Sequence, residues 1–580
     1  MSDPTDNVAS GTQGLFQLGN ALISNWLEFA NKQRELVGRV SSSSSDGVFP
    51  RPENEALTRL QQDLLSRHAV LWADFLKLQP GESAEVRVRP QAGDRRFASA
   101  EWSASPVFDY LRQSYLLNAE FLTKAVDTLP IPEGRAKERA QFLARQYIDA
   151  LAPSNFAATN PDFIRTAIDT RGESITSGIR NLLEDLAKGR ISITDEAAFE
   201  VGRNLAITQG SVIFENELMQ LIQYAPLTDK VHQRPLLIIP PCINKFYILD
   251  LQPENSLVRF VVEQGFTVFL MSWKSVTAAE GHFGWDDYLH LGPLTALEVV
   301  RDVAKVAKPH VLGFCVGGTI LSAALAVAYG RGEDPVESVT LLTTLVDFSD
   351  PGELGCLVDE ASLSAREAAI GRGGLVKGQE LANVFSSLRA NELIWQYVVG
   401  NYLKGDKPQA FDLLFWNSDS ANLPGPFLCW YLRKLYLENA LRMPGRLSML
   451  GVKVDLGEIR APAYLLATRE DHIVPWTGAY LTRSLWGGET TFVLGASGHV
   501  AGVINPPVRN RRSHWVGESL AAAPEEWFEK SQERPGSWWT HWVVWLKARG
   551  GRQVAARKRL GNARYGPIEP APGRYVKARD

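Results

Sequence analysis

The stretch PHVLGFCVGGTI, residues 309–320, decides the fold of this chain. Aliphatic and β-branched residues lead into Gly-Phe-Cys-Val-Gly-Gly, and small residues in a helical pattern follow. A strand, the pattern glycine-x-nucleophile-x-glycine and then a helix form a nucleophile elbow, a sharp turn that exposes one reactive side chain. The sequence therefore predicts Cys315 as a nucleophile between Gly313 and Gly317. The N-terminus of the following helix favours a thiolate at this position.

Strands alternate with helices from about residue 233 onward. Alternation of this kind predicts a mostly parallel sheet with right-handed crossovers, and together with the elbow it predicts an α/β-hydrolase core. Short apolar runs predict strands within 234–241, 266–273, 310–314, 338–348, 462–468 and 491–496.

The length of 580 residues exceeds one ordinary core, so we expect more than one domain. Helical patterns predict a mainly helical N-terminal domain over 1–200 and an α/β-hydrolase catalytic domain over 201–580. One long interval inside the catalytic domain carries helical patterns and aromatic clusters instead of strands, and it is too long for a loop. It predicts a helical cap inserted at about 349–460, above the carboxyl ends of the strands, where it would enclose an active site.

The overall composition is that of a soluble globular enzyme, with 45% hydrophobic residues and a net charge of −4. The absence of a basic excess argues against general nucleic-acid binding. Four cysteines form no disulfide framework, and no Cys/His cluster has metal-ligand spacing, so we expect neither a metal nor a cofactor. No signal peptide or transmembrane segment is predicted, and a reducing cytoplasm is the expected compartment.

An acid and a base are expected after later strands, in that order along the chain. Asp471 lies just beyond the strand predicted to end at 468, and His499 lies just beyond the one predicted to end at 496. The sequence thus predicts a Cys315–Asp471–His499 triad, in which His499 takes the thiol proton and Asp471 orients the imidazole. His472, next to the acid, is the alternative base.

An oxyanion hole needs two backbone N–H groups. Val316, the residue after the nucleophile, is expected to supply one of them. The loop after the strand PLLIIPP should supply the other, from Cys242 or Ile243. Ile243 fits better because it stands two places past Pro241, and Cys242 is then expected to be a buried thiol.

Several long motifs are similar to those of the polyhydroxyalkanoate synthases, specifically the class I type. The resemblance runs from about residue 141 to the C-terminus and is carried by RQYIDALAPSNFAATNP, FEVGRNLAITQGSVIFENELMQLIQY, RPLLIIPPCINKFYILDLQPENSLVRF, GWDDYL, GFCVGGTIL, LLFWNSDSANLPGPFLCWYLR, EDHIVPW and GASGHVAGVINPP. It implies an α/β-hydrolase core with a cap, preceded by a helical domain, in a homodimer. Motif by motif, Cys315 matches the family's nucleophile, Asp471 its acid and His499 its base. Trp416 matches a tryptophan associated with the cap and with dimer formation.

The resemblance also implies a reaction and a location. The substrate would be an (R)-3-hydroxyacyl-CoA, polymerised into polyester with release of CoA through a cysteine thioester, at the surface of a polyester granule or in solution. GFCVGG is closer to the short-chain class, such as enzymes for (R)-3-hydroxybutyryl-CoA, than to the medium-chain class. The segment SWKS (272–275) departs from the Ser-Trp-Arg-Asn-Pro of many relatives, which puts the geometry of this loop in doubt.

Three alternatives remain open at this level. Arg509, Arg511 and Arg512, which follow the histidine loop, would contact the phosphates of CoA or form a solvated basic turn. A thioesterase or polymer hydrolase on the same scaffold would use water as the acceptor, although such enzymes more often use serine. A non-catalytic granule-surface protein would have no need of all three triad residues.

Overall fold

The computed structural model describes residues 55–78, 85–517 and 521–579. The contacts between residues divide the chain into two compact units, 1–62 and 63–580. Much of the first unit, and therefore the start of the predicted helical domain, lies outside the described residues. The predicted domain boundary near residue 200 stays a prediction.

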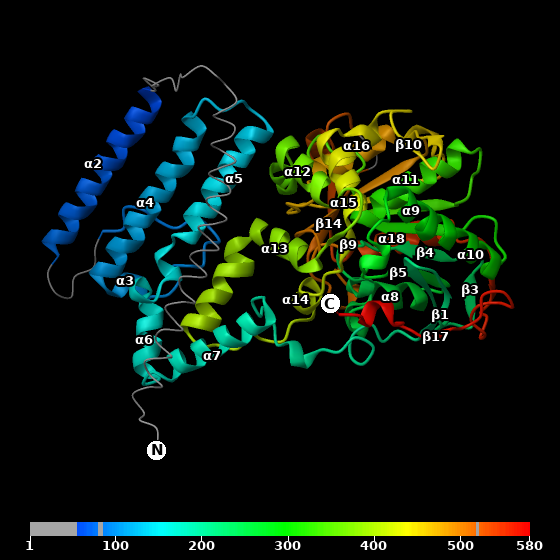
Figure 1. Cartoon of the computed structure of the whole chain (residues 1–580), viewed down its shortest axis with the longest axis horizontal. Coiled ribbons are helices and arrows are strands. Elements are labelled where there is room, and N and C mark those ends of the chain that lie inside the picture. The colour runs from blue at the N-terminus through cyan, green and yellow to red at the C-terminus, as the bar shows by residue number, and fades with distance from the viewer. Residues whose placement is uncertain (1–54, 79–84, 518–520, 580) are drawn as a thin grey trace. The chain divides into compact units, whose positions relative to one another are not determined.

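Helices dominate the described residues before residue 200, as the helical patterns predict, and this stretch includes no strand within its described part (Figure 1). The α4 helix begins with a proline at its first position, where a missing N–H group costs no hydrogen bond. Trp102, Phe97 and Leu116 form a small apolar core for this region. The helices are α2 (Glu55–Lys77), α3 (Glu101–Ala104), α4 (Pro106–Thr128), α5 (Arg135–Ala150), α6 (Pro161–Asp169) and α7 (Glu173–Lys188).

A single sheet of 11 strands organises the rest of the chain, in the order β15-β14-β13-β12-β7-β6-β4-β5-β2-β1-β17. Its six central strands pair in parallel and correspond to the six predicted strands. They are β4 (Leu236–Ile239), β5 (Val268–Trp273), β6 (His310–Phe314), β7 (Ser338–Leu342), β12 (Ala463–Thr468) and β13 (Thr490–Gly495).

Antiparallel strands extend the sheet on both sides, which the alternation of strands and helices does not predict. The β1–β2 hairpin (Gly210–Glu215 and Met219–Tyr224) and β17 (Glu569–Pro570) lie beyond β5. On the other side, β14 (Ser513–Val516) and β15 (Gln532–Pro535) follow β13. These strands join the sheet without crossover helices, so the sequence pattern that identifies the central strands does not mark them.

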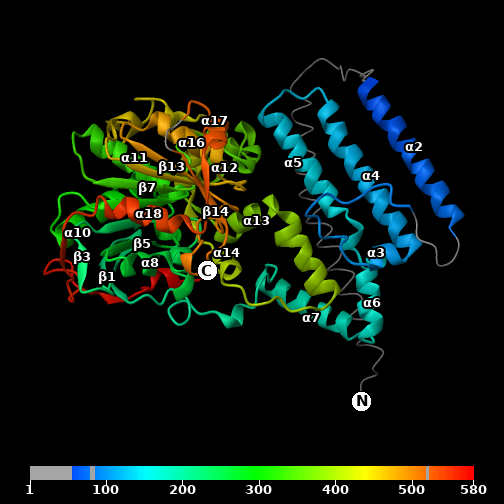
Figure 2. The ribbon, with the colours of Figure 1, turned by 180° about the vertical axis from the view of Figure 1, so that it is seen from behind.

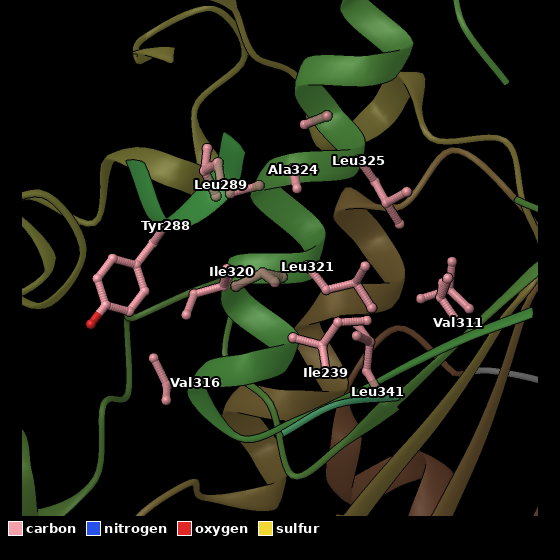
Figure 3. Packing of buried hydrophobic residues seen from close by; sticks show 14 of the residues in the cluster. Ile239, Tyr288, Leu289, Val311, Val316, Ile320, Leu321, Ala324, Leu325 and Leu341 are labelled. Atoms are coloured by element: carbon pink, nitrogen blue, oxygen red, sulfur yellow. The ribbon is translucent and has the colours of Figure 1, made fainter. Parts of the chain in front are cut away.

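Both faces of the sheet are covered by helices, and each face has its own apolar cluster (Figure 1 and Figure 2). On one face, the side chains of α11 pack over Ile239, Val311 and Leu341 of three neighbouring central strands (Figure 3). That face also holds α9 (Trp285–Leu289), α10 (Thr295–Ala304), α11 (Val316–Gly330) and α16 (Trp476–Leu485), whereas α8 (Leu257–Glu263) and α18 (Trp538–Lys547) pack on the opposite face.

A mainly helical insertion separates β7 from β12, which confirms the predicted cap. Its helices are α12 (Glu360–Ile370), α13 (Gly378–Leu388), α14 (Asp412–Asn417) and α15 (Gly425–Tyr431). Stacked aromatic rings join the cap to the core. The ring of Phe427 lies 5.3 Å from that of Trp285 and 3.9 Å from that of Tyr288.

Within the described ranges, no helix combines the length and the apolar character that crossing a bilayer requires.

Candidate active site

Cys315 occupies a sharp turn between the end of β6 and the start of α11. Its backbone has φ 53° and ψ −128°, a conformation that is strained for any residue other than glycine. The Cys315 N–H donates to the Leu342 carbonyl of β7 at 2.9 Å, and the Cys315 carbonyl accepts from the Gly318 N–H at 2.9 Å. These bonds hold the strained residue in place, and the Cys315 side chain stays partly exposed.

Three glycines make this turn sterically feasible. A Cβ on Gly313 would lie 2.4 Å from the Gly318 Cα, and one on Gly317 would lie 2.4 Å from the Pro240 carbonyl oxygen. A Cβ on Gly318 would lie 2.1 Å from the Thr344 Oγ1. Sequence reasoning assigned a role to the first two and missed Gly318, although the doubled glycine of the motif is a signal for it.

His499 and Asp471 meet at the carboxyl end of the sheet, each in the loop after its strand. The His499 Nδ1 lies 2.7 Å from the Asp471 Oδ2, and both side chains are buried. The other oxygen of Asp471 accepts hydrogen bonds from the Ile473 and Val474 N–H groups, each at 2.9 Å. The carboxylate is therefore fixed in orientation and available to one ring nitrogen of His499.

Cys315 is the second polar partner of His499. Burial lowers the pKa of His499, but the Asp471 carboxylate and a hydrogen bond with the Cys315 side chain raise it well above its ordinary value. Because Nδ1 is engaged by Asp471, the nitrogen that remains for Cys315 is Nε2. The arrangement stabilises an imidazolium between two groups that carry negative charge when ionised.

His472, the alternative base, lies in a different environment. Burial, followed by the positive charge of Arg389, lowers the pKa of His472 to about 4. Among the described residues, the imidazole that hydrogen-bonds Asp471 belongs to His499 and not to His472. Of the two histidines weighed from the sequence, His499 is thus the one brought to both other members of the predicted triad.

The two expected oxyanion donors lie on segments that pack against each other. Val316 is the first residue of α11, where a backbone N–H has no acceptor within the helix. Ile243 lies in the loop after β4, and the close approach of Gly317 to the Ile239 and Pro240 carbonyls places the helix start against this loop. Cys242 is buried, as expected, and burial raises the pKa of its thiol.

Trp416 is buried within the chain, in α14 of the cap, and its Nε1 donates to the Lys245 carbonyl at 2.6 Å. The SWKS segment has a related contact, which sequence reasoning missed. Trp273, the last residue of β5, donates from Nε1 to the Pro240 carbonyl at 2.8 Å. Two tryptophans thus hold the loop that carries Ile243, and neither contact has a local sequence signal.

The basic turn after the histidine loop is exposed at Arg509, Arg511 and Arg512. The Arg512 guanidinium donates to the Ala501 carbonyl, which ties this turn to the loop of His499. In the part of the chain that the structure describes, no group of three or more His, Cys, Asp or Glu side chains is arranged to hold a metal ion.

Comparison with known proteins identifies two families. The family described as "Poly-beta-hydroxybutyrate polymerase (PhaC) N-terminus" matches residues 93–261, and the "alpha/beta hydrolase fold" family matches residues 235–506. The chain is 50% identical to "Poly(3-hydroxyalkanoate) polymerase subunit PhaC" of Cupriavidus necator, over 96% of this chain and 95% of that protein. It is 39% identical to the protein of the same name from Rhizobium meliloti, over 100% of this chain and 96% of that protein. A third relative, "Poly(3-hydroxyalkanoate) polymerase" of Methylorubrum extorquens, is 40% identical over 91% of this chain and 87% of that protein.

Proposed function

Because this chain belongs to the poly(3-hydroxyalkanoate) polymerase family, we propose that it polymerises (R)-3-hydroxyacyl-CoA into polyester through a thioester on Cys315. The observation that carries the proposal is the arrangement of three side chains. His499 is hydrogen-bonded to Asp471 through Nδ1 and interacts with Cys315, which sits on a nucleophile elbow. This set of contacts is what acyl transfer by a cysteine requires.

The first half of the reaction loads the enzyme. His499 takes the proton of the Cys315 thiol, and the sulfur attacks the thioester carbon of the substrate. The N–H groups of Val316 and Ile243 stabilise the negative oxygen of the tetrahedral intermediate. When this intermediate collapses, the bond to the CoA sulfur breaks, CoA takes the proton from His499, and the acyl group remains on Cys315.

The second half forms the polyester bond. The 3-hydroxyl of a second acyl group gives its proton to His499, and its oxygen attacks the acyl carbon on Cys315. The carbon–sulfur bond breaks and the Cys315 sulfur takes the proton from His499, which leaves an ester between the two units and a free Cys315 thiol. Asp471 keeps the imidazole oriented and balances its charge in both halves.

A cysteine nucleophile suits this chemistry better than a serine. Attack of Cys315 on acyl-CoA exchanges one thioester for another, so the acyl group stays activated until a hydroxyl accepts it. A serine would form an oxygen ester and lose this activation. Water must be excluded from the loaded site, and the aromatic contacts that join the cap to the core support this role for the cap.

Several finer assignments belong to the same proposal. The resemblance of GFCVGG to the short-chain class implies short acyl chains such as those of (R)-3-hydroxybutyryl-CoA. We assign the CoA phosphates to the exposed turn of Arg509, Arg511 and Arg512, which lies against the histidine loop. We further propose that the enzyme works in the cytoplasm as a homodimer, in solution or on the surface of polyester granules.

The test is to incubate the purified protein with (R)-3-hydroxybutyryl-CoA, follow CoA release by chromatography, and analyse the products for chloroform-soluble polyester. We expect CoA release together with polymer. Release of CoA with only free 3-hydroxybutyrate would mean that water is the acceptor and that the enzyme is a thioesterase. Absence of CoA release would contradict catalysis altogether.

The nucleophile is tested by Cys315→Ala, which should lower CoA release at least about 1,000-fold while the protein stays folded. Cys356→Ala is the matched control, because Cys356 is a buried free thiol in a separate apolar cluster. Turnover that persists in a folded Cys315→Ala protein would overturn the assignment.

A further inference from the structure

We propose that Lys245 is a positioning residue for the oxyanion hole, because it fastens the loop of Ile243 to both the cap and the C-terminal tail. This inference rests on the proposed acyl transfer at Cys315. The residues that carry it are buried polar groups outside the predicted triad, and they converge on one short loop, residues 242–247.

The cap holds the first side of this loop. The Ala421 N–H donates to the Ile243 carbonyl at 2.8 Å, and Asn244 pairs with Ser420 as an antiparallel bridge. The Trp416 Nε1 donates to the Lys245 carbonyl at 2.6 Å. Three consecutive residues of the loop, 243–245, are therefore held by the cap segment 416–421.

Lys245 adds a buried charge to these backbone contacts. Its Nζ lies 2.8 Å from the Asp419 Oδ1, and only 5% of the lysine side chain and 12% of the aspartate side chain are exposed. The second oxygen of Asp419 accepts a hydrogen bond from the Tyr247 hydroxyl at 2.9 Å. Both ends of the 245–247 segment are thus tied to a single carboxylate of the cap.

The C-terminal tail closes the same junction. The Lys245 Nζ also donates to the Ala578 carbonyl, and the Arg579 guanidinium lies over the Phe415 ring at 5.4 Å from its centroid. The tail is anchored nearby by Val576, which is buried in the apolar cluster on that face of the sheet. One ammonium group therefore joins three segments that are distant in sequence.

The expected consequence concerns catalysis more than stability. Burying an ammonium and a carboxylate carries a desolvation penalty that offsets most of their attraction, so the pair is a weak source of stability. The pair does fix the orientation of the loop backbone, because Lys245 is only two residues from Ile243, the proposed oxyanion donor. When a backbone donor is lost from the developing oxyanion altogether, the reaction slows about 100- to 1,000-fold.

The test compares two reactions of the same cysteine. Alkylation of Cys315 by iodoacetamide needs the thiolate and His499 but forms no oxyanion. Acylation by (R)-3-hydroxybutyryl-CoA needs the same two groups and also forms an oxyanion that the backbone donors must stabilise. For Lys245→Met, we expect alkylation within about twofold of the wild type and acylation slowed about 10- to 100-fold, with KM little changed. Lys245→Arg, which keeps the charge, should recover part of the loss.

Two further variants separate positioning from folding. Lys245→Met alone leaves the buried Asp419 carboxylate without its ammonium partner, and the added Asp419→Asn removes that charge. We expect this double variant to be acylated slowly but alkylated at the wild-type rate. Lys137→Met is the matched control, because Lys137 is equally buried at 6% exposure and donates to the Asp127 carbonyl in the helical N-terminal region. This control should acylate at the wild-type rate.

Two results would overturn the inference: acylation at the wild-type rate in the folded double variant, or equal losses in alkylation and acylation. Failure of the proposed function is a separate outcome, because it appears in the wild-type protein itself, which would then release no CoA or would release CoA without forming polymer.

Discussion

The nucleophile elbow and the oxyanion loop face the same reacting carbon in the proposed mechanism, but they are held in place by different means. The turn of the elbow is made by residues within a few positions of Cys315, and the Leu342 carbonyl of β7 supports it from outside. A Cβ on Gly313 would lie 2.4 Å from the Gly318 Cα, and the Cys315 carbonyl accepts from the N–H groups of Gly318 and Thr319. The oxyanion loop at 242–247 has its partners in the cap and in the tail. The elbow is thus mostly local in sequence, whereas the contacts that hold the oxyanion loop all come from distant segments.

This difference implies two kinds of sensitivity. A change in the elbow should disturb every reaction of Cys315, because strand, turn and helix form one rigid unit. A change in the contacts of the oxyanion loop should disturb only reactions that build negative charge on oxygen. Alkylation and acylation of the same thiol therefore report separately on the two halves of the site.

Gly317→Ala is expected to have the largest effect on the elbow. Its Cβ would lie 2.4 Å from the Pro240 carbonyl oxygen and 2.5 Å from the Ile239 carbonyl oxygen, so backbone must move. Both segments that carry the proposed oxyanion donors would then be displaced. We expect acylation to fall about 100-fold or more and alkylation to fall with it, measured as CoA release and as iodoacetamide incorporation.

Gly566→Ala serves as the control for this change, because its Cβ would meet only the Asn562 carbonyl oxygen at 3.9 Å. It should keep wild-type rates in both reactions. An elbow that tolerates alanine at 317 with unchanged acylation would refute the steric account of this turn.

Trp416→Phe tests the oxyanion loop and is expected to have a smaller effect than the change in the elbow. It keeps an aromatic ring in the buried site but removes the hydrogen bond from Nε1 to the Lys245 carbonyl. We expect acylation to slow about 10-fold with alkylation unchanged, because removal of one hydrogen bond of about 1 kcal/mol shifts the loop without unfolding it.

Sedimentation of the same variant tests the expectation, based on the family resemblance, that Trp416 supports the dimer. A dimer that dissociates while acylation is unchanged would assign Trp416 to dimer formation alone.

The same contrast explains how much the sequence could predict. The elbow, the six central strands, the helical cap and the order of Cys315, Asp471 and His499 each leave a local signal, such as glycine spacing or an apolar run before a polar residue. The alternation of strands and helices does not mark the antiparallel edge strands β1, β2, β14, β15 and β17, although β1 and β2 pair locally as a hairpin. Nor can the contact of Lys245 with Asp419 and Ala578 be read from spacing, because cap, loop and tail meet only in the folded chain.

The remaining prediction concerns the strand that carries the elbow and has the smallest expected effect. His310 begins β6, is fully buried, and lies with its Nδ1 2.7 Å from the Ser338 Oγ. Burial, together with nearby positive groups, lowers the pKa of His310 to about 3 in the folded protein. The unfolded chain has a histidine pKa near 6.5 and binds this proton first, so the stabilisation is complete above about pH 6.5 and is lost as the pH falls towards 3.

Between pH 6.5 and 5 the contribution of His310 should decline by about 2 kcal/mol. The lowered pKa values of His472 and His541, each about 4, act in the same direction. Thermal unfolding midpoints should therefore fall on acidification, and His310→Gln should be less stable at pH 7 but show a shallower fall. An equally steep fall in His310→Gln would mean that the other histidines control the acid sensitivity. The strand beneath the elbow would then owe none of its acid sensitivity to this buried imidazole.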